Sequence, residues 1–227
     1  MEKYQGKYRI SSARLQNWDY ESKGMYFVTL CTKNREHYFG NIINPKPDVE
    51  HFEMQLSEIG QIVETEWLRT PEVRPDMNLE LCEYQVMPNH FHAILIIGDN
   101  QYNATGLISE TDKNPDNTCR DAMLASPPID YESKSDSDSD PVYELETQMI
   151  KETNTKGKNK FAPQSKNLGS VMRGFKSSVT SYTKDHNYVF GWQPRYYEHV
   201  IRNDSEYQRI ANYILNNPDK WGNDRLR

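Results

Sequence analysis

The chain has 227 residues, 36% of them apolar, which is enough for one buried core with solvated segments attached. Its net charge is −6, but residues 99–160 alone hold 13 acidic and 7 basic side chains, so the rest of the chain is neutral. The acidic balance therefore does not exclude a nucleic acid partner. The sequence has no run of about 18 apolar residues and no signal-peptide-like start, so we expect a cytoplasmic protein without a membrane-spanning segment.

Three strands and one helix are predicted in the first part of the chain. Residues 25–31 are rich in β-branched and aromatic side chains and predict a strand. Apolar residues at intervals of three and four predict an amphipathic helix over residues 56–70. Two further strands, residues 78–86 and 91–98, are expected to pair as a hairpin through the turn Met87-Pro88-Asn89.

Residues 99–165 show no sustained periodicity and include the run YESKSDSDSDP. This composition predicts a long disordered, flexible acidic insertion. We expect the insertion to loop away from any DNA-binding cleft, because its charge would repel DNA, or to act as an autoinhibitory mimic of DNA. The three cysteines are an odd number at no metal-ligand spacing and are expected to be reduced thiols.

Periodicity resumes with a helix from residue 168 to 182, a short strand over 196–203 and a final helix over 204–218, capped by Asn203 or Asp204. The element order is β-α-β-β-α-β-α, which favours an α+β fold. We expect a ferredoxin-like antiparallel sheet with helices packed on one face. Residues 1–98 would form the first half of the domain, 99–165 the insertion and 166–227 the second half.

His90 and His92 open a continuous apolar strand and flank Phe91. Residues two apart in a strand share a face, so the two imidazoles project together while Phe91 points to the opposite side. Both faces are apolar beyond these residues, which indicates a central strand covered on both sides. Two neutral imidazoles on one face can supply adjacent positions of a metal site. The alternative is a pair of histidines that are only hydrogen-bonded at a strand end.

The final helix offers a polar flank beside its apolar seam. The 100° step per residue puts Tyr213 and Asn217 together on this flank, where a phenol beside a carboxamide could face the strand histidines. The alternative is that Tyr213 and Asn217 have only structural roles, at the flank and at the end of the helix. Asn217 precedes Pro218, which disfavours helical geometry there, so Asn216 is the fallback.

Five segments in order carry a family resemblance: YFVTLCTKNREHYFG, VMPNHFHAILII, GSVMRGFKSSVT, WQPRYYEHVIRN and YILNNPDKW. With them the chain resembles the HUH single-tyrosine transposases, in particular the REP-associated tyrosine transposases. The segments cover most of the chain outside its first dozen residues and the acidic insertion. The chain ends soon after the last of them, at WGNDRLR, which we expect to limit specific hairpin recognition.

The resemblance implies a ferredoxin-like fold and a metal-dependent single-stranded DNA endonuclease and strand transferase that acts at hairpin-associated sites. His90, His92 and Asn217 would be ligands of Mg²⁺ or Mn²⁺, and Tyr213 the nucleophile that forms a 5′-phosphotyrosine intermediate. This intermediate conserves the bond energy, so no nucleotide cofactor is expected. His199 or a metal-associated water is the expected acid/base group.

The expected partner is single-stranded or hairpin DNA, and a homodimer that shares its active sites stays open. Phosphate contacts and stacking surfaces are expected from six residues, although the aromatic ones have a core role as their alternative: Arg173, Lys176, Arg195, Arg202, Trp192 and Tyr196. Two rival functions also stay open. One is a domesticated or inactive protein that binds structured single strands, and the other is a zinc hydrolase, which would need a third strong ligand.

Overall fold

The computed structural model describes residues 22–46, 51–103 and 165–227, together with Trp18, Tyr20, Asp48 and the backbone of the short strands β1 (Lys3–Tyr4) and β2 (Lys7–Tyr8). The predicted acidic insertion therefore lies outside the described residues, except for 99–103 and 165 at its two ends. Within the described part, no helix is both long and apolar enough to span a membrane.

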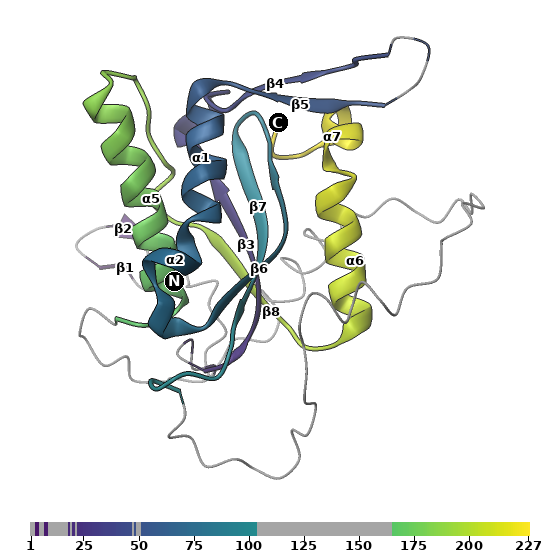
Figure 1. Cartoon of the computed structure of the whole chain (residues 1–227). Helices are drawn as coiled ribbons and strands as arrows, with labels where there is room; N and C mark the ends of the chain where they lie inside the picture. Colours follow the sequence, from purple (N-terminus) through teal and green to yellow (C-terminus); the bar gives the residue numbers. More distant parts are fainter. Residues whose placement is uncertain are drawn as a thin grey trace.

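A four-stranded antiparallel sheet forms the centre of the fold (Figure 1). Its strands lie in the order β6 (Leu79–Val86), β7 (His90–Ile97), β3 (Gly24–Cys31), β8 (Tyr197–Ile201). Helix α1 (Glu58–Leu68) follows β3, and α5 (Leu168–Asp185) leads into β8. This order and the antiparallel pairing confirm the predicted ferredoxin-like β-α-β-β-α-β arrangement.

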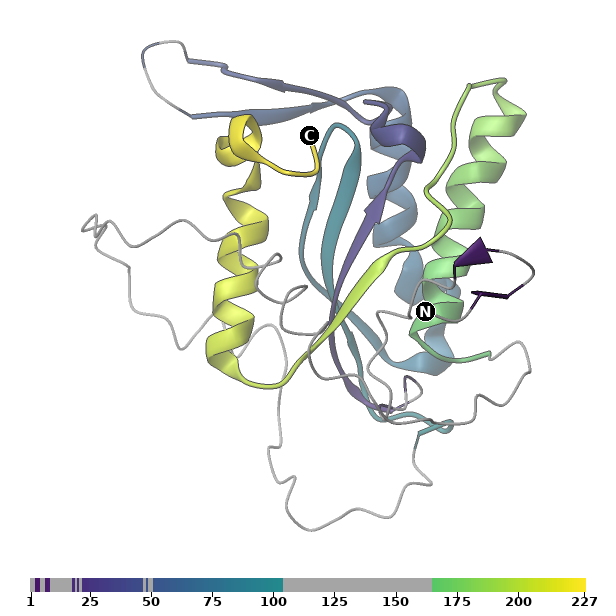
Figure 2. The same cartoon turned by 180° about the vertical axis from the view of Figure 1, so that it is seen from behind.

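The sheet carries apolar side chains on both faces because β3 and β7 are central strands. Helices α1 and α5 pack side by side on one face, as predicted, and their core includes Trp67, Phe91 and Phe175. Helix α6 (Asp204–Leu215) covers the other face, over Phe27 and Ile94 (Figure 2). All eight residues of β7 are buried, so the prediction of a strand covered on both sides is confirmed.

Side-chain caps fix where the three long helices begin. Ser57 accepts from the Gly60 N–H at the start of α1, and Asn203 accepts from the Glu206 N–H at the start of α6. Asn167 forms a capping box at the start of α5. Of the two residues considered for the α6 cap, Asn203 is the one that makes the bond.

Two features that contact each other in the fold, one early in the chain and one near its end, were not predicted. Strands β4 (Gly40–Ile43) and β5 (Glu53–Leu56) pair as a separate antiparallel hairpin, and the chain after α6 forms a short helix, α7 (Asn217–Lys220). The hairpin contacts α7 through the Phe52 N–H, which donates to Asp219 Oδ1 at 2.6 Å. Gly40 is required because a Cβ there would lie 2.0 Å from the Gln55 carbonyl oxygen.

The described residues at the two ends of the insertion meet at one carboxylate. The Tyr102 hydroxyl donates to Asp76 Oδ2 at 2.6 Å, and Lys166 forms an ion pair with the same oxygen. The Nζ of Lys166 also lies 5.0 Å from the centroid of the Tyr102 ring. Cys31 is a buried free thiol, as expected. Cys82 is disulfide-bonded, so the expectation of a reduced thiol is wrong there.

Candidate active site

The first residues of β7 and the last of β3 build the floor of the candidate site. In their antiparallel register Thr29 lies opposite His92 and Cys31 opposite His90. Both histidines have no exposed surface, and their ring centroids are 4.5 Å apart. They share the face covered by α6, while Phe91 enters the core on the other face, as the two-residue strand period requires.

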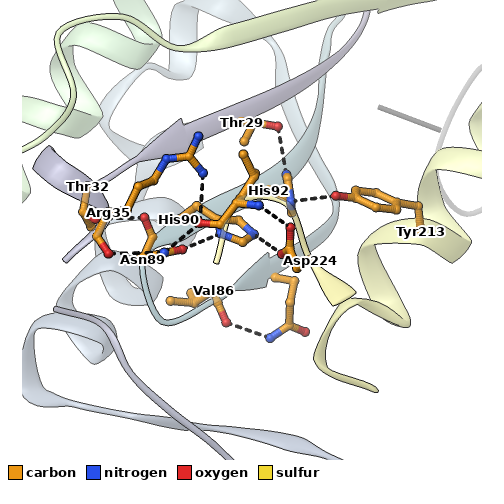
Figure 3. Close-up of polar contacts among 11 residues, drawn as sticks. Thr29, Thr32, Arg35, Val86, Asn89, His90, His92, Tyr213 and Asp224 are labelled. Carbon is orange, nitrogen blue, oxygen red and sulfur yellow. Dashed lines mark hydrogen bonds and ion pairs between the residues drawn. The ribbon is translucent and has the colours of Figure 1, made fainter. Parts of the chain in front are cut away.

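His92 contacts both strand β3 and helix α6. Its Nδ1 lies 2.8 Å from Thr29 Oγ1, and its Nε2 lies 3.3 Å from the hydroxyl of Tyr213 (Figure 3). Both contacts are satisfied when Nδ1–H donates to Thr29 and the phenol donates to Nε2. Burial lowers the pKa of His92 to about 3, so the ring is neutral.

His90 is oriented by the residue before it. The side-chain nitrogen of Asn89 donates to the carbonyls of Leu226 and Arg35, at 2.8 and 3.3 Å. These two bonds orient the amide so that its Oδ1 lies 2.8 Å from His90 Nδ1. Nδ1 therefore carries the hydrogen and Nε2 a lone pair. Within the described part of the chain Nε2 has no hydrogen-bond partner, and it faces Asp224 Oδ2 at 3.5 Å (Figure 3).

Burial, with smaller contributions from His92 and Arg35, holds the pKa of His90 well below its ordinary value. The contact between His90 and Asp224 is therefore a neutral imidazole facing a carboxylate, not an ion pair. Both histidines are in the protonation state that a metal ligand requires.

Asn217 lies on the segment between the residues that contact the two histidines. Tyr213 precedes it and contacts His92, and Trp221 follows it, with its ring centroid 6.0 Å from that of His90. The Asn217 side chain is 2% exposed, and its Oδ1 has no hydrogen-bond partner among the residues that the structure describes. Asn216 is exposed and donates to the Asn212 carbonyl, so the buried carboxamide is Asn217.

Several buried donor atoms of the site suit a divalent ion. They are the Nε2 atoms of His90 and His92, and the chain adds the buried Oδ1 of Asn217, four residues after Tyr213, which makes a mixed nitrogen and oxygen set. Among the described residues no three His, Cys, Asp or Glu side chains form a ready metal site. A zinc hydrolase would need a third strong ligand beside His90 and His92.

His199 does not contact Tyr213. Its Nε2 lies 2.8 Å from Glu206 Oε1, and Glu206 precedes Tyr213 by two helical turns, or ~10 Å. Burial lowers the pKa of His199, and Glu206 opposes this shift. The contact joins β8 to the start of α6.

Three of the six predicted DNA-binding residues come together in one groove. Arg173, Lys176 and Trp192 line a groove of about 490 Å³ along α5, and Lys184 lines it too. Lys176 Nζ donates to the Gln193 carbonyl at 2.6 Å and lies 5.8 Å from the Trp192 ring centroid. Because α5 and α6 cover opposite faces of the sheet, this groove lies on the far side from Tyr213.

The other three predicted DNA-binding residues are more dispersed. Arg195 is exposed just beyond the groove, and Tyr196 is half-buried against the core. Arg202 is exposed at the opposite end of β8, where its N–H donates to Glu206. The structure therefore does not bring Arg202 to the groove.

Thr29, Arg35, Asn89 and Asp224 contact the site but were not predicted. Asn89 had a usable signal, because it directly precedes His90 in the sequence MPNHFH. Asp224 had none, because it is 134 residues from His90 and lies outside any periodic element.

Comparison with known proteins gives a relative in sequence and several solved structures. The sequence matches no protein-family model. It is 31% identical over 222 residues to an uncharacterized protein of Haemophilus influenzae, covering 97% of this chain and 94% of that protein.

Two solved structures are similar at a lower level. A REP-associated tyrosine transposase bound to a REP hairpin is 17% identical with a TM-score of 0.44, over 98% of this chain and 75% of that one. A transposase-like protein from Deinococcus radiodurans is 14% identical with a TM-score of 0.29, over 95% and 97%. The fold assignment rests on the strand order, not on these overlaps.

Proposed function

The chain belongs to the same family as this Haemophilus influenzae protein, and we propose that it is a metal-dependent transposase that cuts and rejoins single-stranded DNA at hairpin-associated sites. The observation that carries the proposal is the 3.3 Å contact between the Tyr213 hydroxyl and His92 Nε2, across 121 residues of chain. It joins a nucleophile to a pair of neutral imidazoles within one buried site.

In the proposed reaction the Tyr213 oxygen attacks the phosphorus of a DNA phosphodiester. A bond forms between the phenol oxygen and phosphorus as the bond from phosphorus to the 3′ oxygen breaks. The phenol loses its proton, and the 3′ oxygen takes one up and leaves as a free hydroxyl. The 5′ end stays on Tyr213 until another 3′-hydroxyl reverses the step, so no nucleotide cofactor is needed.

His90, His92 and Asn217 would hold the divalent ion, Mg²⁺ or Mn²⁺. When bound, the ion would supply charge stabilisation at the attacked phosphate. Thr29 and Asn89 support this role by holding the imidazoles with Nε2 available. For His199 we propose a structural role, because it bonds Glu206 and is two helical turns from the nucleophile.

DNA binding is proposed for the α5 groove, where Arg173 and Lys176 would contact phosphates and Trp192 would stack on an unpaired base. Arg195 and Tyr196 would extend this contact along the chain toward β8. Because the groove and Tyr213 lie on opposite faces, we propose that the groove holds the hairpin while the adjoining single strand reaches Tyr213. Because Tyr213 contacts His92 of its own chain, a site completed within one subunit is proposed.

The test uses hairpin DNA with single-stranded flanks, taken from the sequences beside the gene, incubated with Mn²⁺. We expect a protein–DNA adduct that resists denaturation in wild type and in Tyr182→Phe, a control at a half-exposed tyrosine of α5. Tyr213→Phe should reduce the adduct at least ~100-fold and leave the DNA dissociation constant within about twofold. Tight hairpin binding without an adduct from wild type would favour the inactive DNA-binding protein instead.

A further inference from the structure

We propose that Asp224 is a further metal ligand, delivered to His90 by the C-terminal segment of the chain. The inference rests on the proposed function, because it assigns a residue to the ion which that function requires. It adds a carboxylate to the set of two imidazoles and one carboxamide.

The position of the carboxylate carries the inference. The Asp224 side chain is 4% exposed, and its Oδ2 lies 3.5 Å from His90 Nε2. The other oxygen, Oδ1, accepts from the Leu226 N–H at 2.7 Å. Because Asn89 fixes the hydrogen of His90 on Nδ1, the two atoms that face each other are both electron-pair donors.

Two donor atoms at this separation can share one ion. Ligands ~2.1 Å from a common cation lie ~3.0 to 3.5 Å apart at angles from about 90° to tetrahedral. A carboxylate that faces a lone pair in a buried place is unfavourable without a cation between them. An ion bound there would therefore convert a repulsive contact into an attractive one.

The C-terminal segment is anchored where it meets His90. The Leu226 carbonyl accepts from Asn89 Nδ2 at 2.8 Å and from Arg35 Nη1 at 2.9 Å. The Trp221 ring packs beside His90 and beside His37, at centroid distances of 6.0 and 5.5 Å. The amide of Asn89 thus orients His90 and holds the segment that carries Asp224.

No three His, Cys, Asp or Glu side chains of the described residues already form a metal site. Asp224 Oδ2 faces the Nε2 of His90, whereas the Nε2 of His92 contacts the Tyr213 hydroxyl. The pair His90 and Asp224 forms one side of the site. The ion would draw in His92 and the carboxamide of Asn217 from the other side.

The test measures Mn²⁺ binding to the full chain by titration calorimetry and by the loss of the free Mn²⁺ resonance signal. Asp224→Asn should weaken Mn²⁺ binding at least ~10-fold, because a charged ligand is replaced by a neutral one. Asp185→Asn removes the same charge from an exposed position at the end of α5 and should bind Mn²⁺ like wild type.

Thermal unfolding separates a ligand from a merely structural residue. In EDTA, Asp224→Asn should unfold at the wild-type temperature or above, since its amide can donate to His90 Nε2. With Mn²⁺, wild type should gain several degrees and the variant much less. A variant less stable in both conditions, with unchanged Mn²⁺ affinity, would overturn the assignment of Asp224. A wild type that binds no Mn²⁺ would overturn both this assignment and the metal dependence of the proposed function.

Discussion

At the residue scale, the site depends on two neighbours that fix the hydrogens of two imidazoles. Asn89 uses its nitrogen for two carbonyls and its oxygen for His90, so its orientation follows from three contacts. Thr29 holds the opposite side of the His92 ring. As a result, both Nε2 atoms carry the lone pair, toward Asp224 and toward Tyr213.

The buried histidines predict that the metal-free protein loses stability in acid. Burial lowers the pKa of His92 to about 3 and that of His90 well below its ordinary value, whereas both titrate near 6.5 when unfolded. The free energy of unfolding therefore keeps the full contribution of the two neutral rings above about pH 6.5. As the pH falls below 6.5, this contribution decreases by up to ~1.4 kcal/mol per pH unit for each histidine. Urea unfolding in EDTA at pH 7.5, 6 and 5 measures this.

His92→Gln is the matched variant, because it removes one of the two titrating groups. Its free energy of unfolding should fall less steeply between pH 6.5 and 5 than that of wild type. Equal slopes in the two proteins would contradict the assignment of a neutral, buried His92.

The residues of the site were predictable to different degrees. The shared face of His90 and His92 follows from the strand period alone, and the flank of Tyr213 follows from the helical period. Asp224 and Arg35 reach the site through tertiary contacts between distant segments, which no local period encodes.

At the element scale, α6 positions the nucleophile by packing on the sheet. Tyr207, Ile210 and Ile214 are buried against Phe27 and Ile94, which sets the rotation of the helix and hence the direction of Tyr213. The bond between His199 and Glu206 secures the start of this helix to β8.

The variant His199→Ala separates an anchoring role from a catalytic one. It should lower the free energy of unfolding by ~1 to 2 kcal/mol through the lost bond and leave adduct formation per folded molecule within about threefold. Urea unfolding and the adduct assay under stabilising conditions measure both. A 100-fold loss of adduct with unchanged stability would instead make His199 the acid/base group.

The long elements were predictable because their apolar period is sustained, as in α1, α5 and the hairpin of β6 and β7. Strands β4 and β5 were not, because each has four residues and neither has a buried run. Their pairing depends on Gly40 and on contacts with α7, which only the folded chain supplies.

At the scale of the whole molecule, Tyr102 and Lys166 hold the ends of the insertion together at Asp76, near the end of β7 that is remote from His90. Replacing residues 104–164 with a flexible linker of ~10 residues should change the free energy of unfolding by less than ~1 kcal/mol when both chains are compared under reducing conditions, so that the disulfide of Cys82 is open in each. Urea unfolding of the shortened chain tests this. A loss of several kcal/mol would mean that the segment contributes to the core.

The α5 groove predicts how hairpin binding depends on salt. Removing two phosphate contacts with Arg173→Gln and Lys176→Gln should reduce the slope of log affinity against log salt by about 1.5. Fluorescence anisotropy at several salt concentrations measures the slope. The pair Lys23→Gln and Arg69→Gln removes the same charge outside the groove, where both side chains are paired with acids. An equal change in both double variants would show that only net charge matters.

The most direct test of the central claim is mass spectrometry of the adduct formed with hairpin DNA and Mn²⁺. After digestion by protease and nuclease, we predict a nucleotide attached through a phosphate to the peptide that contains Tyr213, and none on that peptide when EDTA replaces Mn²⁺. A nucleotide on any other residue, or cleaved DNA with no protein attached, would contradict the account.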